Sequence, residues 1–504
     1  MANKKWMSLL SLLVMLSILI CSCNGSGDGN GSGNEETTSN TQDTSGIDSC
    51  DHRYEGSWKC TLCKQELGTS VGLEYSTASS FGFNFAVVTG IGTCTDTDLI
   101  IPYKHDNLIV REIDDCAFRE CNTITSVLLP NTVKDVGIGA FSECTSLASV
   151  TFADYSQLDT VNVEAFQGCK SLEHVDFGAD TSLRVIGMRS FENCTSLTSI
   201  TIPKNVKFIK SDSFLGCKNL FEVYNLSSLE IVKGAETPGH ISYYALDLYT
   251  SANAESKLWK SADEYLFYKD NNAWSLISYM GSKTELTLPA SCQGNSYRIY
   301  ENAFKKSNNL TSVTIPDGVE TIGKSAFAYC PNLTNVTISS DVTSIGESAF
   351  EDCSELLSVT VSPGLKEIGA SAFKKCTNLT SIEIPNSVTS IGHDAFYDCE
   401  SLAGITIPNG ITTIASYTFF DCSSLTSVIL PNSVTNIEEA AFHFLENITA
   451  VFYGGTEDEW ENIEIGEDNY YLTRAARYYY APDGVPDEEG NYWHYNAIGV
   501  PTPW

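Results

Sequence analysis

Four residues near the start of the chain have the types and spacing of a metal site. Cys50 and His52 are followed, after a short interval, by Cys60 and Cys63. Thiolate and imidazole ligands in this number suit tetrahedral zinc, and so short a segment needs a staple in order to fold. Because all four zinc positions would be filled, the expected site is structural and not catalytic. A disulfide within the segment, or a loose linker, remains open, and the sequence indicates no other cofactor.

Cys23 occupies a position that suits lipidation. Residues 1–23 begin with two lysines and continue with an apolar run of signal-peptide length, short for a membrane span. Ile20 and Ser22 precede Cys23 as the aliphatic and small residues of a bacterial lipobox do. These features predict a lipoprotein signal peptide, with several acyl chains on Cys23 for stable anchoring. An ordinary signal peptide is the alternative.

Ten further cysteines recur in register and raise the question of disulfides or a metal ladder. Each follows a repeated Phe by three residues, as Cys376 follows Phe373. Stacked equivalents would lie ~4.8 Å apart, whereas the Cβ atoms of a disulfide lie ~3.8 Å apart. Ser307 and Leu445 take the same register. We therefore expect buried thiols that behave as small apolar groups with a weak hydrogen bond to the backbone.

The histidines give no support for catalysis. The chain has seven, scattered along its length, and none lies in a zinc-protease, serine-hydrolase or nucleotide-loop motif. We predict that the protein is not an enzyme.

The net charge of the chain limits the classes of partner that it can bind. Thirty basic residues against 63 acidic ones give a net charge of −33 over 504 residues. Nucleic-acid binders need a basic footprint, and anionic membranes attract basic segments, so both partners are disfavoured. The simplest reading is a self-repelling, soluble surface.

The element that positions most of these residues is a repeat. A Phe, usually preceded by Ala, recurs twelve times. The interval is 23 residues throughout the second block, Phe304 to Phe442, and is 25 twice in the first block, Phe118 to Phe214. A unit of this length must bury its apolar face against its neighbours. The pattern predicts a β-rich, right-handed leucine-rich-repeat solenoid whose stacked coils form parallel sheets.

Each coil should contain two extended segments and a closing turn. In L-x-x-I-x-I-P, alternate residues face inward, and Pro ends the strand. A second segment, Val-Thr-Ser-Ile in several coils, should line the opposite wall. The Gly after it, as at Gly369, suits a turn with unusual dihedral angles. The Phe should then stack on the Phe of the next coil, and loops should bulge at the insertions near 153–157 and 179–182.

The period breaks between two blocks, each of which opens with an expected hairpin, at 72–92 and at 265–280. We divide the chain into a signal peptide (1–23), a flexible linker (24–49), a Cys/His segment (50–66), a first repeat block (72–259), a second repeat block with its cap (260–480) and an aromatic tail (481–504). The tail either packs back on the last coil or offers its rings to sugars.

Units such as LTSVTIPDGVETIGKSAFAYC and the closing VFYGGTEDEWENIEI resemble the BspA-like class of bacterial surface-antigen leucine-rich repeats. The resemblance covers roughly residues 72–480. It implies an exported or surface-attached protein, and it implies for some members binding to host matrix proteins or other cells. No motif in the chain transfers this binding to named residues.

We therefore expect a monomeric, adhesin-like protein, lipid-anchored on the cell surface or outer membrane and facing outward. Its partners would be surface proteins of host or neighbouring cells, with no nucleic acid, and the lipid would be its only contact with a membrane. A glycan-capture lipoprotein, suggested by the tail and Trp274, and a passive envelope scaffold are the alternatives. The candidate binding face consists of outward strand positions: Thr311, Ser312, Thr314, Thr334, Asn335, Thr337, Thr380, Ser381 and Glu383.

Overall fold

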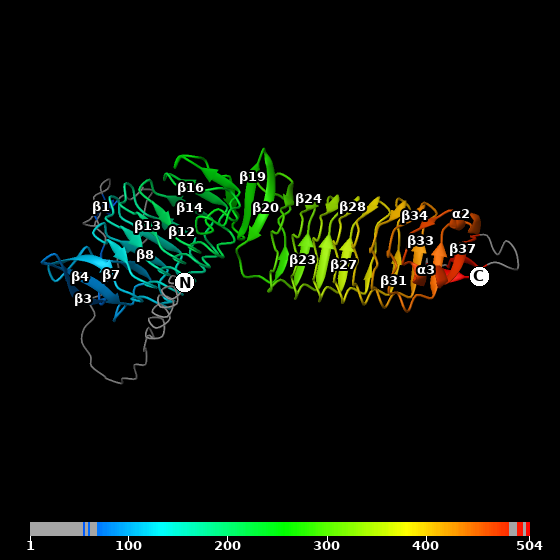
Figure 1. Cartoon of the computed structure of the whole chain (residues 1–504), viewed down its shortest axis with the longest axis horizontal. Helices are drawn as coiled ribbons and strands as arrows, with labels where there is room; N and C mark the ends of the chain where they lie inside the picture. Colours follow the sequence, from blue (N-terminus) through cyan, green and yellow to red (C-terminus); the bar gives the residue numbers. More distant parts are fainter. Residues whose placement is uncertain (1–53, 56–58, 61–67, 483–490, 497–499) are drawn as a thin grey trace, which may run out of the picture. The chain divides into compact units, whose positions relative to one another are not determined.

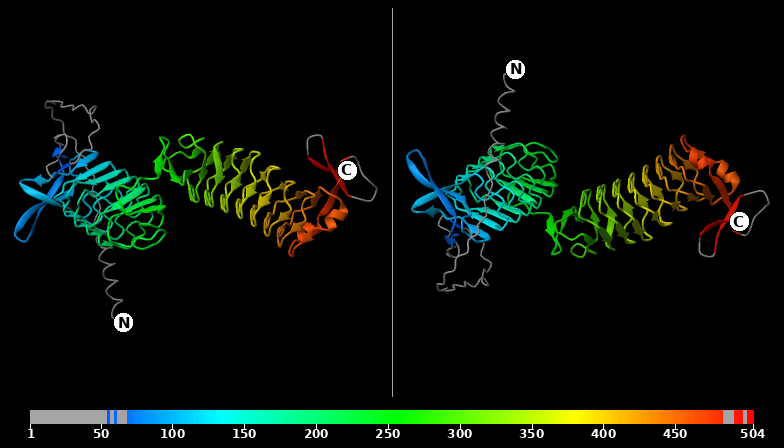
Figure 2. Two further views of the ribbon diagram at one scale, coloured as in Figure 1. Left: turned by 90° about the horizontal axis from the view of Figure 1, so that it is seen from above. Right: turned by 90° about the horizontal axis from the view of Figure 1, so that it is seen from below.

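The computed structural model describes residues 54–55, 59–60, 68–482, 491–496 and 500–504. The predicted lipidation residue Cys23, the linker, and the side chains of the four predicted zinc ligands lie outside this part of the chain. The chain divides into two compact units, Met1–Ser256 and Lys257–Trp504. In each unit the strands lie side by side in successive coils (Figures 1 and 2).

The first unit opens with the expected hairpin. Strand β3 (Glu74–Ser80) pairs antiparallel with β4 (Phe83–Gly90), which pairs parallel with β7 (Leu108–Ile113). The sheet continues through β9 (Asp135–Val136), β11 (Thr160–Val161), β13 (Val185–Ile186) and β15 (Phe208–Ile209), with β6 (Lys104–His105) beside β7. Ahead of it lies the short pair β1 (Tyr54–Glu55) and β2 (Lys59–Cys60).

The other wall of the first unit consists of two further parallel sheets. The strands are β5 (Asp98–Ile100), β8 (Ser126–Leu129), β10 (Ser149–Phe152) and β12 (His174–Asp176), then β14 (Ser199–Ile202), β16 (Glu222–Asn225) and β17 (Asp247–Tyr249).

The second unit repeats this plan. Its first wall is β18 (Leu258–Lys260), the hairpin β19 (Tyr265–Asp270) and β20 (Ala273–Tyr279), then β22 (Tyr297–Ile299), β24 (Val319–Ile322), β26 (Ser344–Ile345), β28 (Glu367–Ile368) and β30 (Ser390–Ile391), followed by β32 (Thr413–Ile414), β34 (Asn436–Ile437) and β36 (Glu464–Ile465). Because β18 pairs with β19, the second unit begins before residue 260.

The opposite wall of the second unit contains β21 (Glu285–Thr287), β23 (Ser312–Ile315), β25 (Asn335–Ile338), β27 (Ser358–Val361) and β29 (Ser381–Ile382), then β31 (Gly404–Thr406), β33 (Ser427–Leu430), β35 (Ala450–Tyr453), β37 (Ala476–Tyr480), β38 (Tyr492–Tyr495) and β39 (Pro501–Pro503). The strands of this wall again pair parallel, except for the antiparallel pair β38 and β39 at its end. The predicted solenoid with parallel sheets is confirmed.

The repeated Phe residues form the expected spine. In the second unit, neighbouring rings from Phe304 to Phe442 stack with centroids 4.8–5.5 Å apart and interplanar angles of at most 17°. The first unit shows the same stack from Phe118 to Phe214, at 4.9–5.3 Å. Phe373, within the spine, is fully buried.

The turn around each spine Phe has a regular backbone that the sequence did not reveal. The residues two before and two after the Phe have left-handed φ angles, as Ser371 (55°) and Lys375 (61°) do. This alternation aims every second N–H at the next coil. Thus the N–H groups of Ser371, Phe373 and Lys375 donate to the next coil's carbonyl oxygens at 2.7–2.9 Å. The turns are therefore a third hydrogen-bonded wall.

The cysteine ladder is part of this wall. Cys399 Sγ donates to the carbonyl oxygen of Phe373 at 3.2 Å, and eight other ladder thiols make the same bond at 2.9–3.2 Å. These cysteines are free and buried. The expectation of buried thiols bonded to the backbone is confirmed.

The glycines after the second strand have a different role from the one expected. Gly323, Gly346, Gly369 and Gly392 are not among the residues with positive φ. A Cβ atom on Gly369 would instead lie 2.7 Å from the backbone nitrogen of Glu347 in the preceding coil. The expectation of unusual dihedral angles is wrong, because these positions require Gly for close approach between coils.

The last coil is closed by two short helices and by the tail. Helix α2 (Glu457–Glu461) starts with a capping box between Thr456 and Glu459, and α3 (Tyr470–Arg474) follows. Strand β38 of the tail pairs with β37, and the indole of Trp493 donates to the carbonyl oxygen of Tyr453 at 2.8 Å. In the described residues, the tail therefore extends the sheet of the solenoid.

Candidate interaction surface

The predicted binding residues lie along one sheet of the second unit. Alternation along β23 and β25 buries Val313, Ile315, Val336 and Ile338 and directs the intervening side chains outward. The parallel register aligns the outward residues of successive coils in two columns. Ser312, Asn335, Ser358 and Ser381 form one column, and Thr287, Thr314, Thr337 and Thr360 form the other.

Six of the nine predicted residues are exposed. They are Thr314, Asn335, Thr337, Thr380, Ser381 and Glu383. The hydroxyl groups of Thr314, Thr337 and Thr380 have no hydrogen-bond partner within the described part of the chain. This face therefore presents polar groups with free hydrogen-bonding capacity and little charge.

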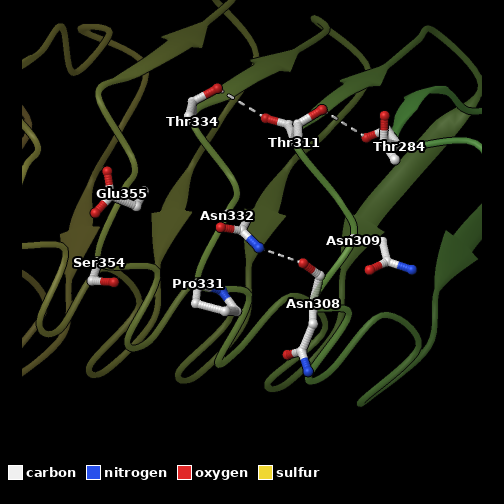
Figure 3. A pocket seen from close by; sticks show the side chains of 9 residues that line it. All are labelled: Thr284, Asn308, Asn309, Thr311, Pro331, Asn332, Thr334, Ser354 and Glu355. Carbon is white, nitrogen blue, oxygen red and sulfur yellow. Dashed lines mark hydrogen bonds between the residues drawn. The ribbon is translucent and has the colours of Figure 1, made fainter.

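The remaining predicted positions are half-buried, and two of them serve the stacking of coils. The Thr334 hydroxyl donates to the carbonyl oxygen of Thr311 at 2.9 Å, and the Thr311 hydroxyl donates to that of Thr284 at 3.1 Å (Figure 3). Because their hydroxyl groups donate to the preceding coil, Thr311 and Thr334 stabilise the stacking of coils and are less available to a partner. Ser312 is half-buried as well.

A hollow of about 630 Å³ lies beside these threonines, open to solvent, where each strand begins (Figure 3). Thr284, Thr311 and Thr334 form one side of it. The opposite side is lined by Asn308, Asn309, Pro331, Asn332, Ser354 and Glu355. Amide and hydroxyl groups thus dominate the lining, with one carboxylate.

The asparagines of this hollow were missed in the sequence. Asn332 Nδ2 donates to the carbonyl oxygen of Asn308 at 2.6 Å, so the amide also joins two coils. A signal was present, because an Asn recurs five residues after the spine Phe at Asn309, Asn332, Asn378 and Asn447.

The insertions of the first unit also shape its surface. The N–H of Tyr155, in one insertion loop, donates to the carbonyl oxygen of Ala179 in the next, at 2.7 Å. A second hollow, of about 460 Å³, lies beside the later loop and is crossed by the Lys204–Asp180 ion pair. Asp180 of the later loop is therefore paired with a lysine of the next coil.

The side chains that line the two hollows can form hydrogen bonds with a ligand. The hollow of the second unit is lined by no His, Cys or Lys that could act as a base or nucleophile. Among the described residues, no group of three or more His, Cys, Asp or Glu is arranged to hold a metal ion. In the same residues, no helix has the length and apolar character needed to cross a membrane.

A parallel β-solenoid with this inward pattern and an outward polar face defines the class of leucine-rich-repeat proteins, which are generally not enzymes. The chain belongs to the BspA type leucine rich repeat family. The family's repeat region matches in six copies, over residues 111–237, 277–402 and 366–464.

Solved structures of bacterial leucine-rich-repeat proteins are similar to the chain. A protein from Bacteroides ovatus is 22% identical, with 81% of this chain and 98% of that one covered and a TM-score of 0.39. A leucine rich cell surface protein from Faecalibacterium prausnitzii is 23% identical (77% and 97% covered, TM-score 0.28). The pneumococcal vaccine antigen PcpA is 17% identical (80% and 96% covered, TM-score 0.30). A comparison with curated proteins gave no match.

Proposed function

We propose that this protein is a non-catalytic surface protein that binds proteins of host or neighbouring cells through the outward face of β23, β25 and β29. The observation that carries the proposal is the pair of exposed columns containing Asn335, Thr337 and Ser381. A flat face of short polar side chains loses little conformational freedom on contact and exposes little charge. Such a face suits a broad contact with another protein.

Two serines of one coil provide a matched test of this face. Ser381 in β29 and Ser390 in β30 are both exposed but lie in opposite sheets. Ser381→Lys places a long charged side chain in the contact, so binding of the purified protein to immobilised matrix proteins or cultured epithelial cells should fall. Ser390→Lys should bind as the wild type does. Equal binding by wild type and both variants, with the fold intact by circular dichroism, would falsify the assignment of this face.

Glycan capture, the alternative function, has less support than protein binding, because the tryptophans that suggested it are mostly covered. Trp274 is 6% exposed and Trp493 is 2% exposed, so neither ring is free to stack on a sugar. Trp504 is exposed but stacks on His494, with centroids 3.7 Å apart. A glycan array should be probed with the full chain and with Trp504→Ala. Binding that is lost in Trp504→Ala would favour glycan capture over protein binding. Absence of binding to proteins, cells and glycans would leave a passive scaffold.

We also propose that the protein is exported and held at the cell surface by lipid on Cys23. The support is the lipobox-like Ile20-Cys21-Ser22-Cys23 and the family to which the chain belongs. Labelling of growing cells with an alkyne fatty acid should mark wild type and Cys21→Ala but not Cys23→Ala. Label retained on Cys23→Ala contradicts the anchor.

Structural zinc in the Cys50–Cys63 segment is a further part of the proposal. The four ligand types and their spacing support it. Elemental analysis of the full chain should give one zinc per molecule, lost in a Cys60→Ser/Cys63→Ser variant. A metal-free wild type, purified without chelator, contradicts the site.

A further inference from the structure

An unusual cluster of aromatic side chains lies on the turn edge of the last coils of the second unit. The residue after the spine Phe is Tyr397, Phe420 and His443 in three successive coils, and Tyr471 of α3 follows. Ring centroids are 4.7 Å apart for the first pair, 5.4 Å for the second and 6.0 Å for the last. Earlier coils of this unit have no aromatic residue at that position. We define the aromatic patch as Tyr397, Tyr417, Phe420, His443, Phe444 and Tyr471.

Phe444 is the residue of this patch that the fold explains least. Its side chain is 44% exposed, and its φ angle is 52°, in the left-handed region. Asp398 and Asp421 take the same position in the two preceding coils. An aromatic residue is strained at such a φ, and strain of this kind gathers at functional sites. Tyr329 takes this position with a φ of 60° in an earlier coil, so the exposure of Phe444, more than its backbone, makes it available for contact with a partner.

The arrangement of the rings disfavours a sugar as that partner. The rings of Tyr397 and Phe420 lie nearly parallel, 6° apart, so each covers a face of the other. Lys374 Nζ lies 4.3 Å from the ring centroid of Tyr397, and the Arg474 guanidinium lies 4.9 Å from that of Tyr471. Sugars stack on ring faces, and in this column one face of Tyr397 and one face of Phe420 are covered by each other. Phe444 lies edge-on to Phe420, at 89° and 5.2 Å.

The charges around the patch select the partner further. Burial raises the pKa of Asp398, and repulsion from the nearby carboxylates of Glu400 and Asp421 raises it further. Glu439 accepts a hydrogen bond from the Tyr417 hydroxyl at 3.2 Å.

The basic groups that act on Asp398 are Lys375 and Lys374, whereas Arg474 lies over the rings of Tyr470 and Tyr471. Lys375 lowers the pKa of Asp398 less than the two neighbouring carboxylates raise it, and Lys374 is paired with Asp394 at 3.1 Å. An acidic rim around the exposed Phe444 and the half-buried rings beside it attracts basic groups and repels anionic lipid.

We propose that the aromatic patch docks a polypeptide segment of a partner protein, one in which an apolar side chain is flanked by Lys or Arg. The apolar side chain packs against Phe444 and the edge of Phe420. The basic side chains pair with Asp398 and Asp421. This surface is on the turn edge, separate from the outward face of β23, β25 and β29, so each can fail without the other.

Panning of the full chain against a phage-displayed random 12-residue peptide library tests this surface. Peptides enriched on wild type over Phe444→Asn should contain an aromatic or large aliphatic residue beside two or more basic residues. Their synthetic forms should bind Phe444→Asn at least about tenfold more weakly. Asn tolerates a positive φ, so the melting temperature of this variant should stay the same or rise, which separates lost binding from lost folding.

Two control variants and two other ligands complete the experiment. Phe208→Asn removes an exposed Phe of the first unit and should bind as wild type does. Asp421→Asn should weaken binding several-fold at low salt, and this difference should vanish in 1 M NaCl, where charges are screened within about 3 Å. Selected peptides without basic residues, or equal binding to Phe444→Asn, overturn the proposal. Phe444-dependent binding of xylohexaose or of phosphatidylcholine vesicles, in place of such peptides, overturns it too.

Discussion

At the scale of single residues, the buried thiols make the stability of this protein sensitive to alkali. Burial raises the pKa of the Cys217 thiol to about 12, and Cys194 and Cys399 are raised well above their usual value for the same reason. A thiol with a raised folded pKa contributes stability that is fully present below its unfolded pKa, near 8.5. This contribution is lost progressively as the pH rises toward the folded value, because the unfolded state releases the proton first.

Cys217→Ser should reduce this alkaline loss. Ser can still donate to the carbonyl oxygen of Phe191, which accepts from Cys217 Sγ at 3.0 Å, but it does not ionise. From pH 8.5 to 10, the free energy of unfolding should fall by about 1–2 kcal/mol less in the variant than in wild type. Urea titrations at the two pH values measure this difference. Cys94→Ser, at a half-buried thiol outside the ladder, is the control, and an identical pH dependence in Cys217→Ser contradicts the argument.

At the scale of elements, the Phe spine holds each coil to two neighbours. Phe373 stacks on Phe350 and Phe396 at 5.4 Å on both sides. Phe373→Ala should destabilise the protein by ~3–5 kcal/mol, because it leaves a cavity in a rigid stack. Thermal melts followed by circular dichroism measure the effect, and a melting temperature unchanged within error would count against the spine.

The glycines between coils allow a second test at this scale. Gly369→Ala places a methyl group 2.7 Å from backbone atoms of the preceding coil and should destabilise. Gly404→Ala is the matched control, since its nearest neighbour atom would be 3.9 Å away. That change should be neutral, or stabilise by about 0.4–1 kcal/mol through the unfolded chain. Equal melting temperatures for the two variants contradict the close-approach role.

At the scale of the whole molecule, the full chain has a net charge of −33, and a stack of thin coils cannot bury the part of it that the coils carry. Like charges repel along such a surface, and salt screens this repulsion over about 8–10 Å at 0.1–0.15 M. The melting temperature should therefore rise as NaCl increases from 10 to 150 mM. Scanning calorimetry measures the shift, and KCl should act equally if screening is the cause. A melting temperature that falls with salt excludes dominant self-repulsion.

The sequence alone determined the solenoid, its two hairpin starters, the Phe spine and the thiol ladder. A repeat can be read in one dimension because each coil contacts mainly its neighbours, so the interval between Phe304 and Phe327 already predicts which rings meet. The inward and outward residues of β23 and β25 followed from period-two alternation for the same reason.

Only the tertiary structure decided which polar residues are free and which hold coils together. Thr311 and Thr314 look alike in sequence, yet one hydroxyl bonds the coil before it and the other faces solvent. The role of Gly369 and the aromatic patch around Phe444 depend in the same way on contacts between coils. The direction of a donor and the distance to the next backbone are properties of the stack, which the order of residues within one coil does not contain.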